Sequence, residues 1–430
     1  MKFGTVDKAG GLAVSAPSLS ESRASLDIYP YKTTFIFIAL YYLISHGRLH
    51  LLIPVLQKIP SAMILGILAV ISFVVEYKKN GDQWHFIREE KLLAGLIMMC
   101  IASLPLSVWP GNSFNSLYKG YLPTVILAFI AGFICKSPKD IEKFLWVYVI
   151  NCTLVIFMAL SAGIGHFSTG VTDMYDVNDI AMVLVCSLPI TFYLMLQQQG
   201  FKKFILSIFM LLTVITIIKT GSRGGALGLL AIAGYVVLNS RSKIKALVIS
   251  TIALVILFAF APEESKERFV TMVKPETEYD QNYGDRKQIW TRGITIALSS
   301  PLVGAGIGNY TVADGSSKDK MGPWKAAHNS YLQIAVELGL IGFVLYVLLT
   351  IGTFIKLHLM KKAVERMEPP SPVVWIIKGA ELTMLAFIVT TFFLSQAYNP
   401  QFYFILAMIV AAKKMVNQQL KIQQSSAEII

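Results

Sequence analysis

The chain has 430 residues, of which 55% are hydrophobic and only 15% are charged, and its mean hydropathy is +0.60. A soluble protein of this length needs far more surface charge, so the composition excludes a soluble globular class. The formal net charge is +12, but the basic residues lie in short clusters between apolar runs, which indicates membrane orientation and no nucleic-acid partner. We therefore predict an all-α polytopic membrane protein, with the lipid bilayer as its environment.

Residues 1–32 are polar and Ser/Ala-rich and have no apolar core of the kind a signal peptide carries, so a cytoplasmic tail is predicted. Apolar runs long enough to cross about 30 Å of hydrocarbon then recur as far as residue 412. The first is interrupted by the polar residues 45–48 and is expected to be bent or partly re-entrant. About twelve transmembrane helices are predicted, over residues 33–56, 61–76, 92–109, 117–135, 144–162, 177–196, 204–218, 221–238, 244–261, 330–356, 374–395 and 401–412.

Lys and Arg residues gather on alternate connections between these runs, whereas the connections 110–116 and 163–175 have none. By the positive-inside rule the basic connections are cytoplasmic, and both termini then lie inside. The predicted organisation is a cytoplasmic tail (1–32), transmembrane helices 1–9 (33–261), an external loop (262–327), transmembrane helices 10–12 (328–412) and a second cytoplasmic tail (413–430).

The external loop between the ninth and tenth helices is the longest polar stretch and is predicted to be a small structured lid. Apolar residues recur within residues 289–298 at a spacing that predicts a helix lying along the membrane surface. The glycines of residues 304–308 predict a turn.

Two cations and several glycines stand at an outer membrane boundary, in residues 219–225. Free backbone N–H groups at a helix start, together with Arg223, favour binding of a phosphate or diphosphate, with Lys219 as a neighbouring contact. The alternative is that Arg223 only extends to the interface as a membrane anchor.

His328 lies where the external loop re-enters the membrane, and its ordinary pKa suits it to accept a proton. Asn329 and Ser330 are candidate caps of the next helix. Arg286 is a candidate phosphate or sugar clamp, or equally a salt-bridge partner of Asp285. The other five histidines are interpreted as having no catalytic role; they are His46, His50, His85, His166 and His358.

An acidic cluster marks another outer helix entrance, and it either binds sugar hydroxyls or caps the helix, with capping the favoured interpretation; it comprises Asp173, Asp176, Asn178 and Asp179. The four cysteines lie in apolar runs and are interpreted as core residues. Neither a nucleotide-binding motif nor metal-ligand spacing is present, so no cofactor and no metal are predicted. Glu337 and Glu381, both inside predicted spans, keep a transporter as an alternative.

Four motifs in order resemble the bacterial O-antigen ligase / O-antigen polymerase superfamily. They are TGSRGG (220–225), GDRKQIW (284–290), PLVGAGIGNY (301–310) and HNSYLQIAVELGLIG (328–342). The resemblance implies a GT-C-like, metal-independent, inverting glycosyltransferase of the bacterial inner membrane, with its active site facing the periplasm. Its donor would be a glycan on undecaprenyl diphosphate and its acceptor a hydroxyl of lipid A-core or a similar molecule.

By the same resemblance, Arg223 and Arg286 would bind the diphosphate, and His328 would orient or deprotonate the acceptor hydroxyl. Lys219, Arg292, Tyr310 and Asn329 are the further candidates for substrate binding. A repeat-unit polymerase and a protein O-oligosaccharyltransferase differ from a ligase only in the acceptor, and both stay open. A polysaccharide or lipid-carrier transporter is the alternative from another class.

Overall fold

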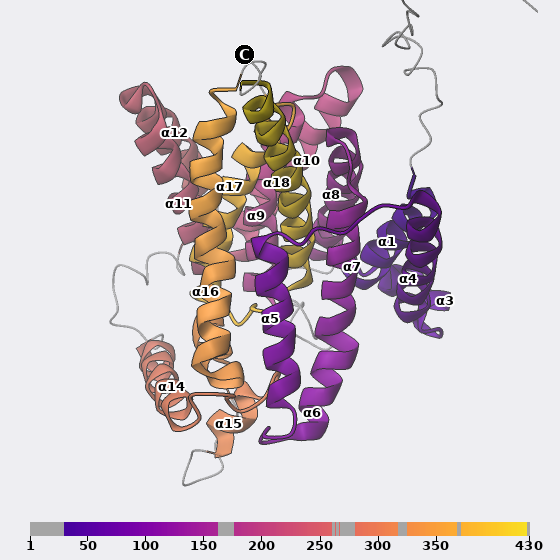
Figure 1. Cartoon of the computed structure of the whole chain (residues 1–430). Helices are drawn as coiled ribbons and strands as arrows, with labels where there is room; N and C mark the ends of the chain where they lie inside the picture. Colours follow the sequence, from indigo (N-terminus) through magenta and orange to yellow (C-terminus); the bar gives the residue numbers. More distant parts are fainter. Residues whose placement is uncertain are drawn as a thin grey trace, which may run out of the picture.

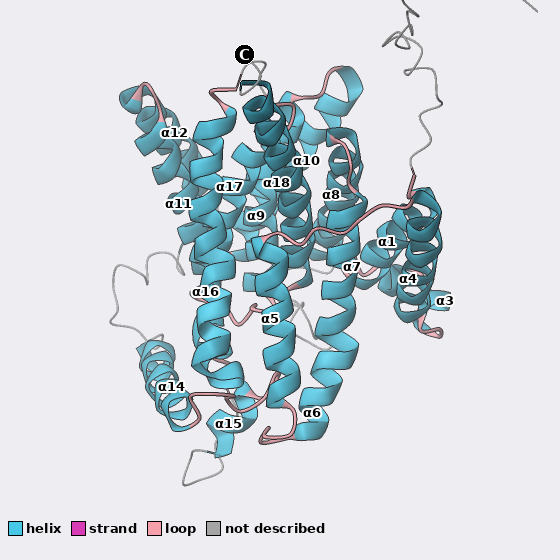
Figure 2. Cartoon of the chain, in the orientation of Figure 1, coloured by secondary structure: helices cyan, strands magenta, loops and turns pink. Residues whose placement is uncertain are grey.

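The computed structural model describes residues 30–161, 176–259, 263, 266, 280–316, 325–367 and 371–427, and within these ranges the regular elements are helices, with no strand (Figures 1 and 2). The helices are α1 (Lys32–Ser45), α2 (Leu49–Leu52), α3 (Pro54–Gln57), α4 (Ser61–Asn80), α5 (Arg88–Ser103), α6 (Pro110–Asn115), the π-helical η2 (Ser116–Tyr121), α7 (Leu122–Ile134), α8 (Pro138–Ser161), α9 (Val177–Leu196), α10 (Gly200–Thr220), α11 (Arg223–Asn239), α12 (Lys243–Ala259), α14 (Asp280–Ser299), α15 (Tyr310–Ser316), α16 (Ser330–Val364), α17 (Val374–Thr391) and α18 (Pro400–Ala427).

Seven helical runs in the described part of the chain are long and apolar enough to cross a membrane: α4, the continuous run Pro110–Ile134, α8, α9, α10, α16 and α17. The chain is therefore a multi-pass helical membrane protein. The other predicted spans also fall on helices, among them α1, α5, α11, α12 and α18, but these are shorter or less apolar. The count of twelve spans stays a prediction.

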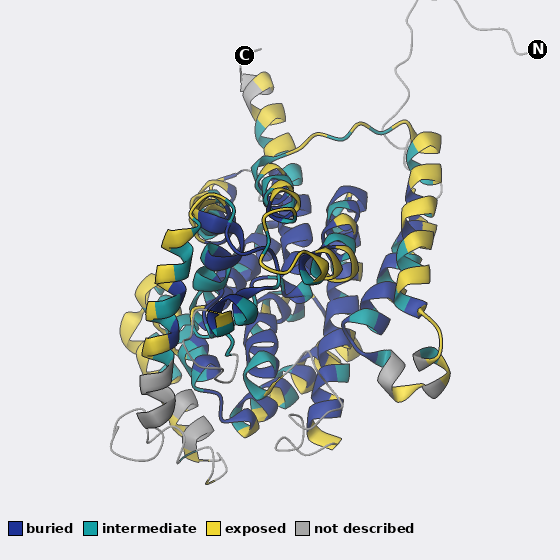
Figure 3. Ribbon diagram, turned by 90° about the horizontal axis from the view of Figure 1, so that it is seen from below, coloured by how far each residue is buried: buried dark blue, intermediate teal, exposed yellow. Residues whose placement is uncertain are grey.

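Helices α9 and α17 form the centre of the bundle. In their apolar windows 78% and 72% of the residues are buried, against 17% in α4, which packs with α1 at one side of the bundle (Figures 1 and 3). The exposed side chains of α4 are large and apolar, as with Met63, Ile67 and Val75. Such a surface suits lipid hydrocarbon rather than water.

The first predicted span is interrupted, as expected from its polar patch. Helix α1 ends at Ser45, and Arg48 takes a left-handed conformation (φ 54°) before two single-turn helices follow. Both His46 and Arg48 are buried here. The polar patch is thus placed inside the protein rather than against lipid, which fits the high cost of exposing such groups to hydrocarbon.

Helix α16 is broken at Gly339, where an uninterrupted span over 330–356 was expected. Gly339 has φ 69° and ψ −172°, and the segment that follows α14 docks into the break. Three backbone hydrogen bonds hold it: Ala305 N to Val336 O (2.7 Å), Gly306 N to Glu337 O (2.9 Å) and Leu340 N to Pro301 O (2.7 Å). The predicted glycine turn is present, and its role is packing, because a Cβ on Gly304 would lie 2.5 Å from the carbonyl carbon of Glu337.

Candidate active site

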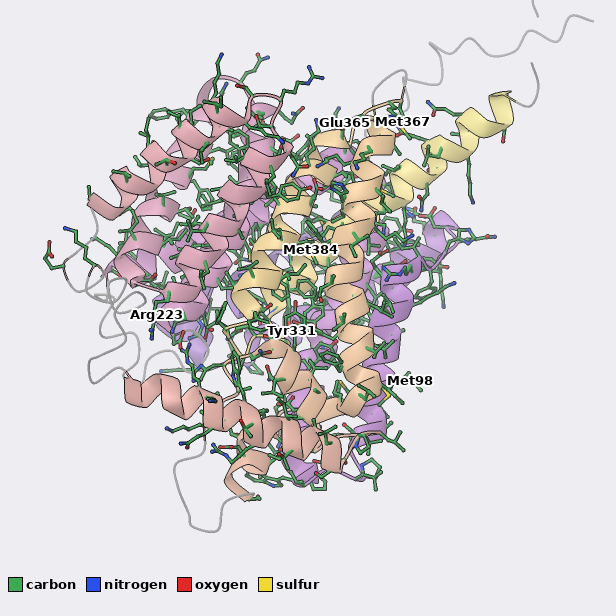
Figure 4. All side chains as sticks on the ribbon, turned by 90° about the vertical axis from the view of Figure 1, so that its left-hand side faces the viewer. Met98, Arg223, Tyr331, Glu365, Met367 and Met384 are labelled. Carbon is green, nitrogen blue, oxygen red and sulfur yellow. The ribbon has the colours of Figure 1, made fainter. Side chains whose placement is uncertain are left out.

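Helix α14 crosses one end of the bundle, roughly perpendicular to α16, with Arg223 and Tyr331 above it and Glu365 at the opposite end (Figure 4). The predicted surface helix is therefore present as α14. We call this end of the bundle the α14 end. The candidate residues Arg223, Arg286 and His328 all lie there, on α11, on α14 and just before α16.

Arg223 is the first residue of α11 and follows a tight turn between α10 and α11. Helix α10 ends at Gly221 in the left-handed region (φ 58°), and Ser222 caps α11 by accepting a hydrogen bond from Gly225 N at 3.2 Å. The hydroxyl of Ser222 also donates to Asn178 Oδ1 at 2.9 Å, which joins the starts of α11 and α9. A Cβ on Gly225 would lie 2.9 Å from the Ala181 Cβ, so this glycine permits the close packing of the two helices.

Arg286 lies half-buried on α14, close to Arg223. Burial lowers the pKa of Arg286, the positive charge of Arg223 lowers it further, and the negative charge of Asp176 opposes both effects. The structure thus brings two guanidinium groups together at the α14 end. Two fixed cations at short range favour an anion with several oxygen atoms, such as a diphosphate.

His328 is held in an unusual backbone conformation, with φ 47°. Its backbone N donates to Ser395 Oγ at 2.8 Å, and the following Ser330 hydroxyl donates to Leu394 O at 2.6 Å. These bonds anchor the start of α16 to the turn after α17. A left-handed histidine held by its surroundings is typical of a functional position.

The imidazole of His328 is half-buried and lies among charges. Burial lowers the pKa of His328, the positive charges of Arg286 and Lys325 lower it further, and Asp176 raises it. The ring is consequently neutral at neutral pH and able to accept a proton.

Asp176 caps α9, as the sequence suggested for this cluster. Its carboxylate accepts from Asn178 N (2.7 Å) and Asp179 N (2.9 Å), while Asp176 N donates to the Asp179 side chain at 3.2 Å. The capping interpretation is confirmed, but it is incomplete, because the charge of Asp176 also acts on Arg286 and His328. Asp173 lies outside the described residues, and so does the side chain of Asp285.

Three of the four further candidates make contacts within the protein, and the fourth, Lys219, is exposed. Arg292 Nε forms an ion pair with the fully buried Asp314 at 2.7 Å, and the Tyr310 hydroxyl donates to Ile289 O at 3.3 Å. Burial raises the pKa of Tyr310. Asn329 caps α16 by accepting from Tyr331 N and Leu332 N, and Lys219 is exposed on the last turn of α10. Their part in substrate binding stays a prediction.

The sequence analysis did not predict the contacts that hold α14 and His328 in place. The indole of Trp290 donates to Ala327 O at 2.9 Å, which ties α14 to the residue before His328. Trp290 belongs to a quoted motif, but nothing in its spacing identifies the distant carbonyl as its partner. Ser395 lies at the end of a predicted span and carried no signal of its own.

The described residues include no group of three or more His, Cys, Asp or Glu side chains that could hold a metal ion. What the α14 end offers is two guanidinium groups, a neutral imidazole and a carboxylate. This set can bind a polyanion, stabilise negative charge that develops during a reaction, and accept one proton.

Residues 208–347 match the model of a protein family described as O-antigen ligase. The chain carries a domain of the O-antigen ligase/polymerase superfamily. The matched segment contains Arg223, Arg286 and His328, so the resemblance seen in the motifs is confirmed. Asp176 lies outside it. No curated protein matches the chain.

Proposed function

We propose that this chain is an inner-membrane glycosyltransferase that moves a glycan from undecaprenyl diphosphate to a hydroxyl of lipid A-core or a similar surface acceptor. The observation that carries the proposal is the convergence of Arg223, Arg286 and His328 at one end of the bundle. All three belong to the segment that matches the O-antigen ligase family.

The acceptor oxygen attacks the anomeric carbon of the donor, and the bond from that carbon to the diphosphate oxygen breaks. The sugar is transferred with inversion, and undecaprenyl diphosphate leaves with the bonding electron pair. Arg223 and Arg286 stabilise the negative charge on the leaving diphosphate, and His328 takes the proton of the acceptor hydroxyl. Because two guanidinium groups offset the diphosphate charge, the reaction is proposed to be metal-independent.

The α14 end is proposed to face the periplasm. Lys361 and Lys362 lie in the last turn of α16, at the end opposite to α14, and basic residues beside a span mark its cytoplasmic side. In this orientation α14 and α15 form part of a periplasmic lid over residues 262–327. The full arrangement is proposed to be GT-C-like, with twelve crossings and both termini in the cytoplasm.

The test is transfer of a lipid-linked glycan to acceptor by the purified protein in nanodiscs. Arg223→Ala, Arg286→Ala and His328→Ala are each expected to lower the rate about a hundredfold or more. Lys287→Ala is the matched control, because Lys287 is exposed on α14 beside Arg286 and is expected to leave transfer unchanged. Transfer at the wild-type rate by the three Ala variants contradicts the proposal.

A repeat-unit polymerase and a protein O-oligosaccharyltransferase share this chemistry and differ only in the acceptor. Surface glycolipids of a deletion strain distinguish them: acceptor without glycan indicates a ligase, and acceptor with a single repeat indicates a polymerase. The transporter alternative gains no support, because Glu337 and Glu381 both have partners within the protein.

A further inference from the structure

Three helix starts meet at the α14 end, those of α9, α11 and α16. Asp176 caps α9, Ser222 caps α11, and His328 precedes the cap of α16. The hydrogen bond from Ser222 to Asn178 joins the first two, and a contact between the Gln396 and Asp179 side chains links α9 to the turn that holds His328. Each helix start adds partial positive charge to that of the arginines.

Asp176 is an acidic residue that acts on Arg286 and on His328. Hydrogen bonds fix its carboxylate in place. One oxygen, Oδ1, accepts two backbone N–H groups at 2.7 and 2.9 Å. The other, Oδ2, has among the described residues a long contact of 3.5 Å with the Asn178 amide, and the residue is exposed. A carboxylate so placed keeps lone pairs available on Oδ2.

His328 needs such a partner if it accepts a proton. The charged groups that act on it are Arg286 from α14, Lys325 from its own segment and Asp176 from the start of α9, with Arg223 of α11 next to Arg286. Of the three groups that act on His328, two are cations, which disfavour an imidazolium ion. Asp179 is a further titratable group at the start of α9, where its side chain accepts a hydrogen bond from Asp176 N.

We infer that Asp176 is a positioning residue whose fixed carboxylate stabilises the imidazolium that forms when His328 takes the proton of the acceptor hydroxyl. This inference rests on the proposed function. The proton moves from the acceptor oxygen to the imidazole and is not passed on to Asp176. Two other roles are possible for the residue, a helix cap alone and a ligand for a sugar hydroxyl, and the test separates all three.

Asp176→Asn is the informative variant, because Asn caps a helix as well as Asp does and only the charge is lost. Removing the negative charge lowers the pKa of His328. Since the neutral ring is the active form, the acid limb of the kcat/KM profile is expected to move about one pH unit lower. The rate on the plateau is expected to fall about tenfold, because a weaker base accepts the proton. Asp176→Glu, which restores a charge, is expected to recover part of the shift.

Asp140→Asn is the matched control. Asp140 also takes backbone N–H bonds at a helix start, that of α8, without acting on His328. An unchanged acid limb in Asp176→Asn with a raised KM for donor indicates a sugar ligand. An unchanged limb with unchanged kcat and KM indicates a cap alone, because Asn still caps α9. Either result overturns the inference. Absence of transfer by the wild-type protein and by Asp140→Asn instead contradicts the proposed function.

Discussion

Glu337 is a buried side chain that holds the docked segment in the break of α16. Its carboxylate accepts from Gly308 N (2.9 Å), Tyr310 N (3.2 Å) and the Tyr398 hydroxyl (2.8 Å), and the residue is 1% exposed. A buried carboxylate is costly unless several donors satisfy it, and here they come from three parts of the chain. Because the docked segment follows α14 directly, Glu337 also fixes the helix that carries Arg286.

Replacing Glu337 by Ala leaves those buried donors without their acceptor. Each unsatisfied group costs about 1–3 kcal/mol, so Glu337→Ala is expected to lower the free energy of unfolding by about 3 kcal/mol or more. Thermal melting of the detergent-solubilised protein measures this. Glu365→Ala, at the C-cap of α16, is the control, because its ion pair with Lys378 is partly exposed and such pairs contribute about 1 kcal/mol at most. Equal melting temperatures for the two variants contradict the assigned role of Glu337.

Helix α11 is fastened at both ends, and this determines where Arg223 lies. Near its far end the Tyr235 hydroxyl donates to Glu381 of α17, which also binds His358 Nδ1 (2.7 Å) and Lys361 Nζ (2.6 Å) of α16. Glu381 is 1% exposed, and these partners compensate its charge inside the protein. His358, which was interpreted as having no catalytic role, is thus part of the contact between α11, α16 and α17.

Removing one partner of the Glu381–Lys361 ion pair is expected to destabilise the protein more than replacing both partners by apolar residues. Glu381→Leu leaves the partly buried Lys361 without its carboxylate partner and is expected to cost about 3 kcal/mol of unfolding free energy. The double variant Glu381→Leu/Lys361→Met replaces the ion pair by apolar groups and is expected to recover most of that loss. Melting curves of the wild type and of the single and double variants decide the point. A double variant no more stable than Glu381→Leu contradicts it.

Periodicity and caps predicted α14, the glycine turn and the start of α9, because those features depend on neighbours in the sequence. The break at Gly339 was not predicted. It is stabilised by Pro301 O and by the backbone around Ala305, which are distant along the chain, and the apolar pattern of residues 330–356 continues across it. The grouping of Arg223 with Arg286 was available only from the family resemblance, since Arg223 alone suits a membrane anchor and Arg286 alone suits a salt bridge with Asp285 or a lid charge.

At the scale of the whole molecule, charge and burial divide the bundle into a central part and two different ends. The core of α9 and α17 supports the α14 end, where Arg223, Arg286, His328 and Asp176 gather around three helix starts. At the opposite end the basic residues are partly compensated by carboxylates, as in the ion pairs of Lys361 with Glu381 and of Lys378 with Glu365. By the positive-inside rule we propose that the α14 end faces outward.

This orientation can be tested by labelling single introduced cysteines in whole cells with a permeable outer membrane. Lys287→Cys on α14 is expected to react with a membrane-impermeant maleimide in intact cells, and Lys362→Cys at the end of α16 only after the inner membrane is opened. Both lysines are exposed, whereas the four native cysteines are buried and are expected to react slowly. The wild-type protein measures that background. Labelling of Lys362→Cys but not Lys287→Cys in intact cells reverses the orientation, and a periplasmic glycosyl transfer at Arg223 and His328 is then excluded.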